Sequence, residues 1–89
     1  MNIITEYATA INKVDFFFGS EYAKQAVWGH TEKETIRMAY DNLVSFFTEL
    51  HEDSIEVSDK RLYFACVEYC YIQIAKIDLG KIESEAQAV

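Results

Sequence analysis

The sequence contains no proline and only three glycines among its 89 residues. Both residues interrupt helices, so their scarcity favours a mostly helical chain. Basic residues are also few, since eight lysines and arginines stand against fifteen aspartates and glutamates, a formal net charge of −7. Binding to DNA or RNA through phosphates needs a basic surface. The composition therefore predicts an all-α protein that does not bind nucleic acid directly and would suit a basic partner.

Cysteine and long apolar runs are scarce as well. Cys66 and Cys70 lie four positions apart on one predicted helix, where they cannot bond to each other without distorting it. A chain without a disulfide framework belongs in a reducing cytoplasm. The apolar run 62–75 carries a single charge, Glu68, and is too short to cross a bilayer. With no secretion signal in view, we expect a cytoplasmic protein without membrane contact.

The chain is rich in apolar side chains, which make up 51% of its residues; the aromatic ones among them make up 15%. This composition favours a folded domain over disorder. Over residues 3–18 the apolar positions recur three and four apart, the spacing of an amphipathic helix. Gly19 suits the left-handed position beyond a helix end. We therefore expect this helix to stop there, followed by a short helix, 21–28, that Ser20 caps and Gly29 ends.

Two longer helices are expected next. Thr31 and Glu34 form a capping box, and apolar positions three and four apart carry that helix to His51. A polar loop, 51–58, separates it from a last helix that Ser58 caps and Gly80 ends.

The predicted architecture is all-α. An N-terminal amphipathic helix and a short helix precede a long antiparallel helical hairpin, and the chain is predicted to assemble as an oligomeric bundle. Residues 1–80 form a single helical domain, and 81–89 a polar C-terminal tail.

The last helix is apolar around most of its circumference. On a wheel of residues 61–79 the apolar arc is about twice the roughly 100° of an ordinary surface helix. Two other helices of a short chain cannot cover it, and large exposed apolar patches usually mark interfaces. We therefore predict self-association, or a partner protein on this face; alternatively, its tyrosines tolerate exposure with their hydroxyls in water. The candidate interface residues are Tyr63, Val67, Tyr69, Tyr71 and Ile74.

No motif predicts catalysis, a metal or a cofactor. The thiols Cys66 and Cys70 would need imidazoles beside them, and His30 and His51 both lie near predicted helix ends. We interpret the cysteines as small buried apolar residues.

Carboxylates crowd the predicted polar loop. Such a surface can dock basic side chains or mimic phosphates, although it lacks the glycine and the ligand spacing of an EF-hand. The alternative is an ordinary solvated loop. The residues are Glu49, Glu52, Asp53, Glu56 and Asp59.

A small nucleotide is a further candidate ligand. Stacking on a tyrosine combined with pairing of phosphates by cations needs only a local basic pocket, even on an acidic protein. The candidate residues are Tyr22, Arg37, Lys60 and Arg61.

The segment from Tyr22 to Ile77 resembles the helical-hairpin domain of phage anti-CBASS cyclic-dinucleotide sponge proteins. That family has a tyrosine ahead of the hairpin, a lysine early in its first long helix, and Asp-x-Arg starting the second. Tyr22 and Arg37 stand at about the corresponding places, and Asp59-Lys60-Arg61 opens the last helix. Arginine replaces the family's lysine, and residues 1–20 are unlike it. The apolar series that follows the family's register is Leu62, Ala65, Cys66, Cys70, Ile74 and Ile77.

The resemblance implies a compact oligomer that binds cyclic dinucleotides between subunits and hydrolyses nothing. From the residues themselves we expect a non-enzymatic, self-associating, small acidic interaction protein. A phage or mobile-element inhibitor of a host defence or regulatory protein would fit that description. The sponge is the alternative.

Overall fold

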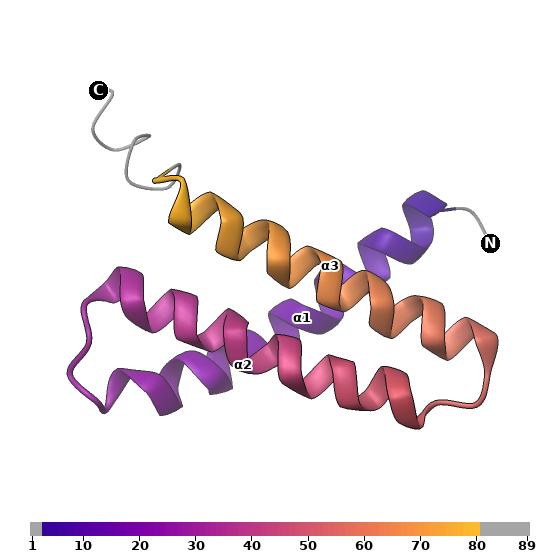
Figure 1. The fold of residues 1–89 in the computed structure, drawn as a ribbon, viewed down its shortest axis with the longest axis horizontal. Helices are drawn as coiled ribbons and strands as arrows, with labels where there is room; N and C mark the ends of the chain where they lie inside the picture. The colour runs from indigo at the N-terminus through magenta and orange to yellow at the C-terminus, as the bar shows by residue number, and fades with distance from the viewer. Residues whose placement is uncertain (1–2, 81–89) are drawn as a thin grey trace.

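The computed structural model describes residues 3–80. Within that range the chain forms three α-helices and no β-strand, so the all-α prediction is confirmed. The helices are α1, Ile3–Ala26; α2, Glu32–Asp53; and α3, Val57–Asp78 (Figure 1).

The predicted break at Gly19 is wrong, because α1 is one helix that runs through this residue. Gly19 does not have a positive φ, and the expected short helix 21–28 is mostly the last part of α1. The physical reason is packing on α2. Before the glycine, Phe18 stacks on Tyr40 of α2 with ring centroids 4.6 Å apart; beyond it, Glu21 accepts a hydrogen bond from Asn42 of α2 at 3.5 Å. Contacts on both sides of Gly19 thus favour one continuous helix over the modest penalty of a helical glycine.

The junction between α1 and α2 follows the prediction. Gly29 has φ 77°, the left-handed conformation that suits glycine after a helix end. Thr31 then caps α2, with its hydroxyl accepting from the Glu34 amide at 3.1 Å, while the Thr31 amide donates to the Glu34 carboxylate at 2.9 Å. These hydrogen bonds to Thr31 hold the pKa of Glu34 below its usual value. The capping box is confirmed.

The junction between α2 and α3 is tighter than predicted. α2 continues to Asp53 and α3 starts at Val57, so only residues 54–56 connect them. Glu56 occupies the cap position without a side-chain cap hydrogen bond, and the predicted cap Ser58 lies inside the first turn. The Lys60 ammonium group connects the first turn of α3 to the end of α2, because it donates a hydrogen bond to the His51 carbonyl at 3.0 Å. At the far end Gly80 has the expected positive φ, 73°.

The helices α2 and α3 lie side by side and run antiparallel, and α1 crosses behind both (Figure 1). Arg37 near the start of α2 binds Asp78 at the end of α3. Tyr7 of α1 meets Tyr69 of α3 edge to face, with centroids 6.2 Å apart. The core lies where the three helices meet, and each large side chain buried there contributes about 1.5–3 kcal/mol. Its largest fully buried side chains are Phe47, Leu43, Ile77, Val14, Cys66 and Cys70.

The predicted tail, residues 81–89, lies outside the described residues, as do Met1 and Asn2. None of the helices in the described range is both long enough and apolar enough to span a membrane.

Candidate interaction surfaces

One side of α3 faces away from α1 and α2, and it is largely apolar. Its residues recur three and four positions apart, so they share a stripe along the helix. The large apolar side chains in this stripe are between 44% and 74% exposed. We call this stripe the α3 outer face: Val57, Arg61, Phe64, Glu68, Tyr71, Ile72, Ala75 and Leu79, all of which are exposed.

Little charge breaks the α3 outer face. Arg61 donates to Glu6 of α1 at 2.9 Å, which leaves Glu68 as the one other charged side chain of the face. Phe64 stands between two hollows of about 200 Å³ each. One is lined by residues of α1 and α3, and the other lies against His51 at the end of α2. The face therefore offers both an aromatic ridge and spaces on either side of it.

The corresponding side of α2 is different. Its exposed positions carry carboxylates, an amide and a hydroxyl, with Met38, 36% exposed, as the large apolar side chain among them. This is the ordinary solvent face of an amphipathic helix. The other exposed apolar side chain of α2, Phe46, packs on Phe17 of α1. The apolar outer face is thus peculiar to α3 and does not follow from the bundle architecture. The polar α2 positions are Glu34, Asp41, Asn42, Ser45, Glu49 and Glu52.

Among the residues predicted to form the oligomer interface, Tyr71 alone is exposed, at 56%. Ile74 is buried among the protomer's own helices. Tyr63 stacks on Phe47, and Tyr69 meets Tyr7 of α1. Val67 is half-buried and packs against the core.

The exposed apolar residues of the α3 outer face that sequence reasoning missed are Val57, Phe64, Ile72 and Leu79. An all-round apolar helix does not reveal which of its sides faces inward. The one available signal was the position of Cys66 and Cys70, because cysteine is among the most buried residue types and these two mark the inward side.

The predicted acidic residues are all exposed at the end of the bundle where α2 meets α3. Two apolar side chains lie among them, Ile55 at 91% exposure and Val57 at 71%. Within residues 3–80 no cluster of histidine, cysteine or carboxylate groups is arranged to hold a metal ion. We call this region the acidic tip: Glu49, Glu52, Asp53, Ile55, Glu56 and Asp59.

The four candidate nucleotide-binding residues do not meet at one place in the protomer. Arg37 forms a bidentate pair with Asp78, at 2.7 and 3.1 Å, and this pairing raises the pKa of Arg37 and lowers that of Asp78. Lys60 and Arg61 lie at the other end of α3, about 25 Å along the helix. Tyr22 is half-buried against Phe18. Each cation already binds an oxygen of the protein itself.

The two thiols are fully buried, as expected, and they are free. Burial raises the pKa of Cys66 to about 11 and that of Cys70 to about 12, so both stay protonated near neutral pH. The Cys66 thiol donates a weak hydrogen bond to the Ala10 carbonyl at 3.8 Å. The ring of His51, which a Cys–His pair would need, instead lies against Phe64. A protonated buried thiol is a poor nucleophile and a poor metal ligand.

Comparisons of the chain with protein-family models, with curated proteins and with solved structures give no match. The resemblance to the sponge family therefore rests on the residues quoted for it alone.

Proposed function

We propose that this chain is a non-enzymatic interaction protein that self-associates through the α3 outer face. The observation that carries the proposal is the exposure of Val57, Phe64, Tyr71, Ile72 and Leu79 on one side of one helix. Together they expose on the order of 500 Å² of side-chain surface, at the upper end of what a soluble monomer leaves uncovered. Covering that area favours association by on the order of 10 kcal/mol per protomer before the entropy of association is subtracted.

Introducing a charge on the α3 outer face tests self-association directly. Ile72→Glu places a carboxylate where a second chain would pack, and Met38→Glu makes the same change on the polar side of α2 at similar exposure. We expect sedimentation equilibrium to show an oligomer for the unmodified protein and for Met38→Glu, and a smaller species for Ile72→Glu. A chain that stays monomeric at its highest soluble concentration would refute self-association.

The acidic tip supports a second part of the proposal, the capture of a basic partner protein. A host defence or regulatory protein is the class that the sequence analysis favoured. Carboxylates at the rim accelerate the approach of a basic surface, and a protruding Ile55 can enter an apolar pocket once contact is made.

The tip is tested by charge reversal with a matched control. Changing Glu52, Asp53 and Glu56 to lysine alters the tip, while changing Asp15, Glu32 and Asp41 to lysine makes the same net charge change at exposed acids elsewhere. A protein captured from host lysate should bind the tip variant more slowly, and the difference should shrink at high salt. Equal association rates for the two variants would remove the tip from the proposal.

A further inference from the structure

The side of α1 that faces away from the other helices carries an uncharged stripe, with Lys13 along one edge and Asp15 along the other. Phe16, 79% exposed, stands near the middle of this side. Its ring and that of Phe17 meet edge to face, with centroids 5.1 Å apart. Hydroxyl, amide and small side chains make up the rest, on one side of the helix over about five turns. We call this stripe the α1 outer face: Thr5, Ala8, Thr9, Asn12, Phe16, Gly19, Ser20 and Ala23, all of which are exposed.

Gly19 has no role inside the protomer that would account for it. It lies within α1 without a positive φ, and a Cβ added there would meet nothing within 4 Å. Glycine in a helix interior lowers stability relative to alanine. Neither a turn nor a close approach within residues 3–80 requires glycine at this position. Close approach of a group from outside the protomer remains as the physical reason for a bare backbone here.

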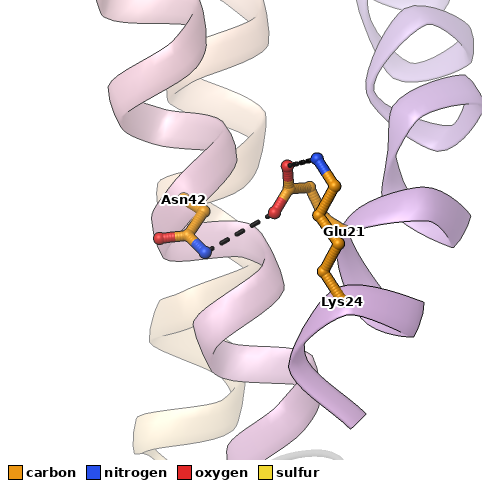
Figure 2. Close-up of polar contacts among 3 residues, drawn as sticks. All are labelled: Glu21, Lys24 and Asn42. Atoms are coloured by element: carbon orange, nitrogen blue, oxygen red, sulfur yellow. Dashed lines mark hydrogen bonds and ion pairs between the residues drawn. The ribbon is translucent and has the colours of Figure 1, made fainter. Parts of the chain in front are cut away.

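The basic side chain near the C-terminal end of this face, Lys24, is paired beside it. Glu21 pairs with Lys24 at 3.4 Å and accepts from Asn42 of α2 at 3.5 Å. Figure 2 shows the Glu21 carboxylate lying between the two, so that it holds the Lys24 ammonium group beside the α1–α2 junction. The residues of the α1 outer face are themselves uncharged, and Lys13 and Asp15 lie at its edges. A hollow of about 410 Å³ borders it, lined by Thr9, Asn12, Lys13, Phe16 and Phe17.

We propose that the α1 outer faces of two copies of this chain pair antiparallel about a two-fold axis, with the Phe16 ring of each copy packed over Gly19 of the other. In such a pair, if one residue lies opposite a second, the second lies opposite the first. In this one register, the protruding Phe16 ring of each copy is covered and the bare backbone at Gly19 of the other is filled. The same register sets further larger side chains opposite alanines: Asn12 opposite Ala23, and Val27, which is 77% exposed, opposite Ala8.

The surface available is sufficient for a dimer. α1 spans 24 residues, about 36 Å. Phe16, Val27 and the adjacent Trp28, 71% exposed, offer on the order of 400 Å², about half of the roughly 800 Å² that each partner buries in a standard interface. The hydroxyl and amide side chains of the face supply the remainder. The α1 and α3 outer faces share no residue, so this contact does not depend on the one proposed for α3.

The experiment uses the full chain carrying Ile72→Glu, which removes the contact proposed for α3. Sedimentation velocity should show a dimer of this variant. Adding Gly19→Leu should weaken the dimer at least about tenfold, because the side chain fills the space that Phe16 of the other copy occupies. Adding Asp41→Leu, on the polar side of α2, should leave it unchanged. A monomeric Ile72→Glu variant, or a dimer that survives Gly19→Leu, would overturn the α1 pairing.

A second measurement separates association from folding. Gly19→Ala should raise the melting temperature of the dilute, monomeric protein by about 4 °C, since the protomer has room for the methyl group. A lower melting temperature would show that the protomer itself needs the glycine and would sink the premise. If the unmodified chain and Ile72→Glu form the same dimer and Gly19→Leu dissociates it, the α1 contact stands while the α3 contact fails.

Discussion

The two buried thiols should make this protein unusually sensitive to alkali. In the unfolded chain a cysteine ionises near its ordinary pKa of 9.0, whereas burial raises the pKa of Cys66 to about 11 and of Cys70 to about 12. Above pH 9 the unfolded state therefore loses two protons that the folded state keeps. Stability is fully present below pH 9 and falls as pH rises toward the folded values, by about 1.4 kcal/mol per thiol per pH unit.

For two thiols the slope approaches 3 kcal/mol per pH unit only well above pH 9, and the loss between pH 9 and 10 is about 2 kcal/mol, a sizeable part of the 5–15 kcal/mol typical of a domain. Urea unfolding under reducing conditions at pH 8, 9, 9.5 and 10 measures it directly. Tyr40, whose pKa burial raises to about 12, and Tyr69, whose pKa is also raised, add to the loss only above the ordinary tyrosine value of 10.0. The window from pH 9 to 10 thus isolates the cysteines. The double variant Cys66→Ala/Cys70→Ala should be less stable at pH 8 but nearly flat across this window. A flat profile in the unmodified protein, or the same slope in the variant, would refute the reasoning.

Two further predictions concern the fold. Thr31→Ala should lower the free energy of unfolding by about 1 kcal/mol because it removes the cap of α2, whereas Ser58→Ala should change it by no more than a few tenths, because Ser58 is not a cap. Urea titration of the pair decides this, and equal losses would argue against the observed start of α3. Phe47→Ala should lower it by about 3–5 kcal/mol, since the ring is fully buried against Phe17 and Tyr63; the same change at its neighbour Phe46, 39% exposed, should have a clearly smaller effect. Comparable losses at the two positions would contradict the placement of the core.

The sequence predicted a helix end correctly where that end depends only on residues next to it in the chain. Thr31 and Glu34 form their capping box through atoms three residues apart, and Gly29 and Gly80 adopt the left-handed conformation that glycine alone adopts easily. Gly19 carried the same signal and misled, because distant packing decided there. Phe18 before it stacks on Tyr40 of α2, and Glu21 after it accepts a hydrogen bond from Asn42 of α2. A local preference for a break of about 1 kcal/mol does not outweigh such contacts.

The surfaces were harder to predict than the helices. The excess of apolar residues on the last helix was visible in the sequence, but the inward side of that helix depends on how α1 crosses the other two. Tyr69 is half-buried where Tyr7 of α1 meets it, whereas Phe64, beside a hollow that α1 also lines, stays 54% exposed. The same crossing places Arg37 and Arg61 at opposite ends of α3, each paired with a carboxylate, which no spacing in the sequence indicated.

Folding of the protomer and association between protomers use different sides of α3, so substitutions can test the two independently. Cys66, Cys70, Ile74 and Ile77 already fill the inward side, so the bundle has no need of apolar residues on the outside. Leu79, 74% exposed, adds little to burial in one protomer, and the exposed half of Phe64 adds none; both increase the tendency to aggregate unless another chain covers them. Polar substitutions on the outward side should therefore leave the unfolding free energy of the isolated protomer nearly unchanged while altering its mass in solution. If instead such substitutions unfolded the chain at low concentration, the folded protomer would itself depend on its neighbours, and association would be a condition of folding.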